Sequence, residues 1–386
     1  MMLRDSRPPL FTCEIRDVNP PEFLDLQVVD SHVHFDDTKY AAVMLKVIEG
    51  ARFHRINLAS LISRQKVNSN PESLYFKAKH PKRTYAFGAL DYSPLFLGER
   101  WGSLDLAAQA DTLMKTGFDG VKMVEGKPTS RKMVPLYLDG EAYEEFFSKA
   151  DSSGFPILLH VADPEEFWDV AKVPMWAKKH GWFYGNGSYP EKEQLYMEID
   201  NVLEEHPGMK VIFPHFYFLS ADLERAARLL NRYPNVYLDL TPGIEMYYNF
   251  SRDTEKSREF FLRYQDRILF GTDITSDLTL SQALARAWIV RKFLETDESF
   301  HLPAHADELL EGPVEAPLRG LGLPSDVLGK IYARNFEKIA GKEPARISLD
   351  LAVAECERLG ATVEKIGTEE RLKSALEIAR RLREIG

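Results

Sequence analysis

Eight short apolar runs alternate with longer amphipathic stretches along most of this chain, and this alternation limits the fold more than any other feature. Strands that alternate with helical stretches are typical of βα units around a parallel sheet. Eight such units are the number that closes a barrel. The sequence therefore predicts the α/β class and a TIM (β/α)8 barrel over residues 26–340. The runs begin at Leu26, His54, Thr84, Phe118, Phe155, Lys210, Val236 and Arg267.

Three segments exceed the minimal barrel, which commonly takes about 250 residues as one domain. Residues 1–25 contain several prolines, and we expect them to lie across the barrel bottom or against a neighbouring subunit. Residues 163–209 contain the aromatic turn WFYGNGSYP and follow the fifth strand, so we expect a lid over the site. Residues 341–386 predict two amphipathic helices with a packing or dimerisation role.

Composition excludes several classes of partner. The formal net charge of -10, without a dense basic cluster, argues against nucleic acid. The sequence has no apolar stretch near the ~20 residues that a membrane span requires, and its first residues lack the apolar core of a signal peptide. Cys13 and Cys356 lie far apart, which suggests neither a disulfide framework nor a thiolate metal site. We expect a cytoplasmic protein that acts on a small molecule.

Five polar residues stand at or near the ends of four apolar runs. His32 and His34 lie in VVDSHVHF, His160 in FPILLHVAD, His215 in VIFPHFYF and Asp273 in ILFGTDI. Alternate side chains of a strand share one face, so the first two imidazoles can point at one ion. A single buried histidine is more often hydrogen-bonded core than ligand, but burying this whole set unpaired is costly. The pattern therefore predicts a metal site at the carboxyl ends of the strands, where barrel enzymes carry their chemistry.

Imidazoles with a carboxylate suit a borderline ion such as Zn²⁺, which leaves a coordination position for water in catalytic sites. Binding lowers the pKa of that water to roughly 7. Asp273 can then act as the general base, and His215 can polarise the substrate or stabilise its developing charge.

These motifs resemble the amidohydrolase superfamily, and within it the amidohydrolase-related group that includes the aminocarboxymuconate semialdehyde decarboxylases. The resemblance runs from about Val28 to Gly341 and includes DSHVHF, a His ending strands five and six, GTD on strand eight and the closing segment KIYARNFEKIAG. It implies a homo-oligomer with one divalent metal. It also implies two sets of residue roles: metal ligands His32, His34, His160 and Asp273, and a catalytic or second-metal role for His215.

Lys122, in the run GVKMVEG, raises the question of a second metal. In binuclear members of the superfamily, a carboxylated lysine from strand four bridges two ions. The group that this chain resembles is largely mononuclear and often carries a similar GVK. A lysine paired with a carboxylate inside the barrel mouth is the alternative that we expect.

Other polar residues have weaker functional signals. Asp239 and Thr241 share a strand face and are expected to point into the barrel with hydrogen-bonded structural roles. His54 lies at the wrong end of its strand, and a surface loop is expected for His301 and His305. Four loop-end residues could touch substrate, although solvated or structural roles are expected: Glu125, Asp163, Tyr217 and Glu245.

Three functions are compatible with this site. The first is a zinc-dependent hydrolase in which metal-activated water attacks an amide, ester or lactone carbonyl. The second is a metal-dependent non-oxidative decarboxylase, a carbon–carbon lyase that uses the same ligands. Basic residues at the mouth would favour it, and Lys122 is the candidate that the sequence offers. The third is a non-catalytic scaffold, which would be expected to lose ligand residues, whereas all five positions are filled.

Overall fold

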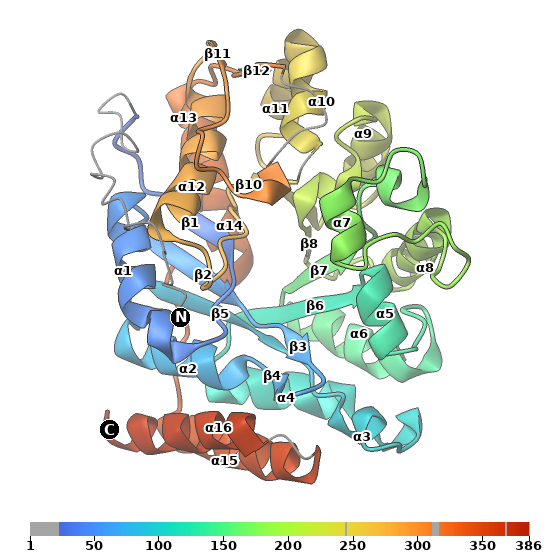
Figure 1. Ribbon diagram of the computed structural model, residues 1–386, viewed down its shortest axis with the longest axis vertical. Helices are drawn as coiled ribbons and strands as arrows, with labels where there is room; N and C mark the ends of the chain where they lie inside the picture. Colours follow the sequence, from blue (N-terminus) through green and yellow to red (C-terminus); the bar gives the residue numbers. More distant parts are fainter. Residues whose placement is uncertain (1–22, 244, 311–315, 367–368, 386) are drawn as a thin grey trace, which may run out of the picture.

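The predicted barrel is present in the computed structural model, which describes residues 23–243, 245–310, 316–366 and 369–385. Its sheet has eight parallel strands in the order β1-β2-β5-β6-β7-β8-β9-β10 (Figure 1). Each predicted run contains one strand, so the prediction of a TIM barrel is confirmed. The strands are β1 (Val29–Val33), β2 (Arg55–Ala59), β5 (Thr84–Ala89), β6 (Gly120–Gly126), β7 (Ile157–Val161), β8 (Val211–Phe213), β9 (Val236–Asp239) and β10 (Ile268–Leu269).

The barrel closes where the first strand meets the segment that contains and follows the last one. The Ser31 amide donates to the Phe270 carbonyl at 3.0 Å, and the His34 amide donates to the Ile274 carbonyl at 2.8 Å. Between them, the Asp273 amide donates to the His32 carbonyl at 2.9 Å. Backbone pairing thus joins two parts of the chain that lie far apart in sequence, and it places the GTD motif beside the HVH motif.

An outer layer of helices follows the strands, one after each. Several of these helices begin at a side-chain cap: Asp105, Asp222 and Asp253 each accept a hydrogen bond from the first turn, and Thr279 forms a capping box with Gln282. The helices of this layer are α1 (Ala41–Gly50), α2 (Asn70–Lys79), α4 (Leu106–Thr116), α6 (Glu141–Ser153), α8 (Lys192–Glu205), α9 (Leu223–Arg232), α11 (Thr254–Arg263) and α12 (Leu280–Glu295).

The amino-terminal end of the barrel is filled by apolar side chains. Phe336, on α14 (Asn335–Ala340), packs against Tyr85 and Phe87 with ring centroids 5.1 and 5.9 Å apart. These rings form one buried cluster with Val29, Leu158, Ile212 and Leu269. The π-helical stretch Lys330–Arg334 and α14 form the KIYARNFEKIAG segment, and α13 (Ser325–Gly329) directly precedes it. Because apolar side chains fill the amino-terminal end of the barrel, we expect the site at the carboxyl ends of the strands.

Segments at both ends of the chain were predicted to lie beyond the barrel. The extension expected at 1–25 lies largely outside the described residues. At the carboxyl end, α15 (Leu349–Ile366) and α16 (Glu369–Arg383) lie side by side and pack against α2 of their own barrel (Figure 1). Their role in dimerisation stays a prediction. None of the described helices is long and apolar enough to cross a membrane.

The 163–209 segment has a small apolar cluster of its own, separate from the barrel core. Phe167, Val173, Ala177 and Tyr184 are buried together, and the segment contains α7 (Met175–Lys179) and α8. Shorter elements complete the fold: the strand pairs β3 (Ile62–Ser63) with β4 (Val67–Asn68) and β11 (Ser299–Phe300) with β12 (Leu318–Arg319), and the helices α3 (Ser93–Phe96), α5 (Pro128–Met133) and α10 (Met246–Arg252).

Helix α4 ends at Gly117, whose φ of 100° is a left-handed cap, and a Cβ there would lie 2.4 Å from the Arg346 carbonyl oxygen. We expect Gly117→Ala to lower the free energy of unfolding by about 1–2 kcal/mol for the backbone and roughly 1–3 kcal/mol more for the clash. Gly98→Ala is the control, because Gly98 also has a positive φ of 84° but open space around its Cβ. Equal losses in urea unfolding would contradict this account.

Candidate metal centre

The side chains predicted to form a site meet at the carboxyl ends of the strands, although three of them lie beyond the strands themselves. His160 lies within β7, and His34 directly follows β1. His215 and Asp273 come after β8 and β10 have ended, in left-handed backbone with φ of 54° and 53°. Such a conformation is uncommon for residues other than glycine and is concentrated at functional sites. The short strands therefore leave these two residues on irregular backbone.

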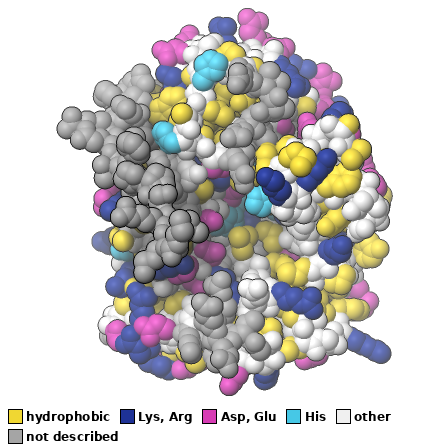
Figure 2. All heavy atoms as spheres, viewed as in Figure 1, with side chains coloured by type: hydrophobic (Ala, Val, Ile, Leu, Met, Phe, Trp, Pro, Cys, Tyr) yellow, Lys and Arg dark blue, Asp and Glu magenta, His cyan; other side chains and the backbone are white. Residues whose placement is uncertain are grey.

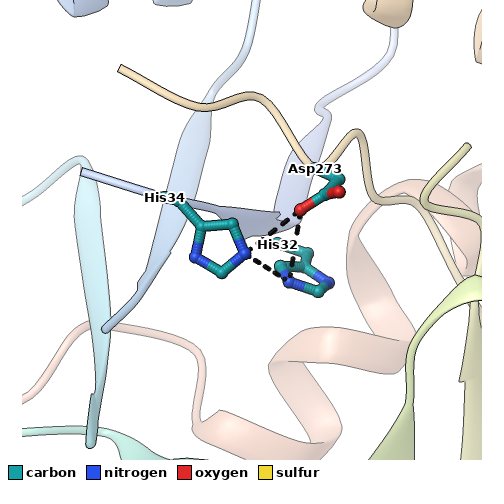
Figure 3. A group of neighbouring side chains, drawn as sticks. All are labelled: His32, His34 and Asp273. Atoms are coloured by element: carbon teal, nitrogen blue, oxygen red, sulfur yellow. Dashed lines mark hydrogen bonds and ion pairs between the residues drawn. The ribbon is translucent and has the colours of Figure 1, made fainter. Parts of the chain in front are cut away.

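Three of the predicted ligands converge on one point (Figure 3). The Nε2 atoms of His32 and His34 are 3.1 Å apart. The Asp273 Oδ1 atom lies 3.1 Å from His34 Nε2 and 3.7 Å from His32 Nε2. All three side chains are largely buried, with exposed fractions of 1% for His32, 11% for His34 and 17% for Asp273.

The other ring nitrogen of each imidazole has a partner that fixes its proton. His32 Nδ1 donates to the Asp239 carboxylate at 3.0 Å, and His34 Nδ1 donates to the Ala59 carbonyl at 2.6 Å. A carbonyl or carboxylate oxygen can only accept, so the proton is assigned to Nδ1 and the lone pair to Nε2. Two lone pairs therefore face each other across 3.1 Å, with a carboxylate oxygen beside them.

This donor set fits a divalent metal. Two lone-pair nitrogens cannot hydrogen-bond to each other, and only a cation or a donor between them makes their approach favourable. Burial lowers the pKa of His32, which keeps the ring neutral. Burial alone would raise the pKa of Asp273, but the neighbouring imidazoles of His34 and His32 hold it well below its usual value. Neutral imidazoles held by outer partners, together with a carboxylate, are what metal sites present.

His160 and His215 line the same pocket but are not members of this group of three among the described residues. His160 Nε2 donates to the Ala162 carbonyl at 2.9 Å, and His215 Nδ1 donates to the Thr241 carbonyl at 3.3 Å. Their ring centroids are 5.0 Å apart. Burial lowers the pKa of His215 to about 3, so this imidazole is neutral at ordinary pH and its Nε2 is an acceptor.

Asp239 connects His32 and His215 through its two carboxylate oxygens. One carboxylate oxygen accepts from His32, and the other accepts from the His215 amide at 2.9 Å and the Thr241 amide at 3.0 Å. The sequence predicted that Asp239 and Thr241 point into the barrel with structural hydrogen bonds. Both residues are buried and do form hydrogen bonds, and their partners are the predicted ligand His32 and His215.

Lys122 reaches the same centre. Its Nζ atom lies 3.1 Å from His32 Nε2, to which it donates. Burial lowers the pKa of Lys122 to about 8.

Arg286 holds the Asp273 backbone, and sequence reasoning missed it. This arginine on α12 is 2% exposed, donates to the Asp273 carbonyl and lies 3.7 Å from Asp273 Oδ2. Its Nε and Nη2 atoms donate to the Asp307 carboxylate at 2.8 and 2.9 Å. No local motif marks this ion pair, because it depends on how the loop after α12 folds back.

The centre opens into a pocket of 270 Å³. The space-filling view shows a hollow near the middle of this face, with histidine side chains inside it (Figure 2). The predicted lid segment supplies Phe167, Trp176 and Trp182 to the pocket wall. Lys127 also lines it, paired with Asp163 at 2.7 Å and 4.5 Å from the Trp182 ring centroid. Asp163, expected to be solvated or structural, is thus a buried part of the wall.

The sequence model of the amidohydrolase family matches residues 29–339. The chain belongs to the amidohydrolase family. No curated protein matches the sequence.

Two solved structures with a TM-score of 0.50 share the fold of this amidohydrolase at low identity. An uncharacterised TIM-barrel protein from Bordetella bronchiseptica is 14% identical with a TM-score of 0.50, covering 85% of this chain and 99% of its own. A protein described as amidohydrolase II is 15% identical with a TM-score of 0.50, covering 82% and 100%. A 5-carboxyvanillate decarboxylase from Sphingomonas paucimobilis is 12% identical with a TM-score of 0.47, covering 82% and 99%.

The Asp239 contact predicts a test of the centre. Asp239→Asn keeps the size of the side chain but removes the carboxylate that fixes His32, so we expect affinity for a divalent metal to fall roughly 10- to 100-fold. Asp277→Asn, at an exposed carboxylate on the same rim, should leave affinity unchanged. The measurement is competition with a chromogenic chelator, with circular dichroism to verify folding. Equal affinities in the two variants would contradict the role of Asp239.

Proposed function

We propose that this amidohydrolase is a metal-dependent hydrolase in which water attacks an amide, ester or lactone carbonyl of a small molecule. The observation that carries the proposal is the convergence of His32 Nε2, His34 Nε2 and Asp273 Oδ1 at the inner end of a pocket. A buried centre with a carboxylate beside neutral imidazoles suits activation of water in a site shielded from bulk solvent.

In this proposal His32, His34 and Asp273 hold the ion, with His160 as a fourth ligand from the same pocket, and zinc is the metal that such a set favours. A divalent ion in such a site lowers the pKa of water and polarises a carbonyl oxygen. His160 can take part through Nδ1, because its Nε2 proton is directed to the Ala162 carbonyl.

The protein side chains divide the remaining work. Asp273 accepts the proton of the attacking water and returns it to the leaving group, and Arg286 keeps its strained backbone in place. Lys122, whose Nζ lies beside His32, stabilises negative charge that develops on the carbonyl oxygen. His215 presents Nε2 to the pocket as an acceptor that orients the water or the substrate.

Non-oxidative decarboxylation is the second candidate, and Lys127 favours it. This cation lies in the pocket wall beside the ring of Trp182, where it can hold a carboxylate against an aromatic surface. Sequence reasoning found Lys122 as the basic residue at the mouth, and Lys127 adds a second. The pair of lysines suits an anionic substrate in either reaction.

A product-resolved screen separates the two reactions. The zinc-loaded enzyme is incubated with panels of small lactones, esters, amides and aromatic carboxylates, and both acid release and CO₂ release are measured. We expect acid release without CO₂, lost in Asp273→Asn and kept in the control Asp277→Asn. Release of CO₂ at a stoichiometry of one per product would replace hydrolysis with decarboxylation.

His215 should matter more to turnover than to metal binding. We expect His215→Asn to keep metal content nearly intact, because the four proposed ligands remain. We expect kcat to fall roughly 100-fold, because the water or the substrate loses the acceptor that positions it. Steady-state kinetics with metal analysis of the same sample is the measurement. Loss of metal would make His215 a ligand, and unchanged kcat would remove it from the mechanism.

The proposal includes an unmodified Lys122 and one ion per chain. Elemental analysis of protein purified with zinc should therefore give close to one equivalent, and added bicarbonate should not raise it. Two ions about 3.5 to 4 Å apart in a crystal structure, the separation usual for paired catalytic metals, would show that Lys122 is the bridge.

A further inference from the structure

A second cavity, of 290 Å³, lies outside the barrel mouth between α8 and α9. Its apolar surface comes from the rings of Tyr196, Tyr217 and Tyr233 and from Leu219 and Leu229. None of these residues belongs to the catalytic pocket. The cavity is large enough for a molecule of roughly ten heavy atoms, at the small end of ligand pockets.

Two of the charged groups around this cavity already have partners. Arg225 forms two hydrogen bonds of 2.7 Å with Glu193, and Arg232 pairs with Glu204. These ion pairs also hold the guanidinium groups over the tyrosine rings, 4.6 Å from the Tyr196 centroid for Arg225. The side chains of both arginines therefore form part of the cavity wall.

Arg228 and Asp200 are different. Among the described residues, neither side chain makes a hydrogen bond or an ion pair, and the two do not pair with each other. Asp200 feels the charges of Arg232 and Arg225 only at longer range. The cavity thus presents one free cation and one free anion on opposite helices, α9 and α8.

Two of the three tyrosines that line the cavity have buried hydroxyl groups. The hydroxyls of Tyr217 and Tyr233 have no hydrogen-bond partner among the described residues, and these residues are only 4% and 7% exposed. Burial raises the pKa of Tyr217 most, and Tyr196 and Asp200, both of which line the cavity, raise it further. Neither hydroxyl oxygen is accessible, so a ligand in the cavity would contact the tyrosine rings.

We propose that this cavity is a binding site for a small zwitterion of amino-acid type, with its carboxylate on Arg228, its ammonium on Asp200 and an apolar side chain against the tyrosine rings. A simple anion would meet the Asp200 carboxylate, and a simple cation would meet three guanidinium groups. A ligand with both charges matches the two unpaired ions, and specificity follows from that match.

One turn of the chain connects this cavity to the catalytic pocket. Tyr217 belongs to the left-handed turn His215–Phe218, and the Tyr196 hydroxyl donates to the Tyr217 carbonyl at 2.9 Å. A ligand that contacts Tyr217 therefore restrains the backbone that presents His215 to the catalytic pocket. Binding itself does not depend on which reaction the enzyme performs.

The test is isothermal titration of the full chain with L-phenylalanine. We expect saturable binding of one equivalent. 3-Phenylpropionate lacks the ammonium group and phenethylamine lacks the carboxylate, and each should bind at least ~10-fold more weakly, since a hydrogen bond to a charged group is lost. Absence of saturable binding by L-phenylalanine, or equal affinity for the three compounds, would overturn the proposal.

Variants place the binding in this cavity. Arg228→Gln and Asp200→Asn should each weaken L-phenylalanine binding roughly 10-fold or more. Arg263→Gln, at an exposed arginine on α11, is the matched control and should bind like the wild type. Arg228 is exposed and Asp200 is only partly buried, so both variants are expected to fold, which circular dichroism verifies. Unchanged affinity in Arg228→Gln and Asp200→Asn would show that the ligand binds elsewhere.

Discussion

The backbone pairing between β1 and the segment around β10 is the interaction on which the site depends. Strand β10 has only two residues, so closure rests largely on hydrogen bonds made by Ser31, His34 and Asp273 beyond its ends. The same bonds that close the barrel set the distance between the HVH and GTD motifs. A loss of pairing here would open the barrel and separate the proposed ligands together, so fold and site are coupled at this seam.

Electrostatics is the second constraint, because the barrel mouth buries many ionisable groups. Each described histidine of the pocket has one ring nitrogen committed to a carbonyl or carboxylate: His32 to Asp239, His34 to Ala59, His160 to Ala162 and His215 to Thr241. This arrangement keeps the rings neutral and fixes their tautomers. It stabilises less than an apolar core of the same volume would, and such a cost is typical of functional sites.

The sequence predicted the barrel because the barrel depends on local patterns. The ligand set His32, His34, His160 and Asp273 stays a prediction, of which three members lie together. Eight β-type runs mark eight strands, and period-two spacing puts His32 and His34 on one face. Other features depend on contacts between distant segments and carry no local signal. The Asp307–Arg286–Asp273 chain and the Lys127–Asp163 pair depend on loop conformation. The position of His215 on left-handed backbone, beyond the strand that its run predicted, has the same origin.

The central claim is that His32, His34 and Asp273 hold one ion at the inner end of the pocket. The most direct measurement is a crystal structure of zinc-loaded protein with anomalous data on both sides of the zinc absorption edge. The account predicts a single peak within ~2.0–2.2 Å of the Nε2 atoms of His32 and His34 and of an Asp273 carboxylate oxygen. No peak there, or a peak bound without these three side chains, would contradict it.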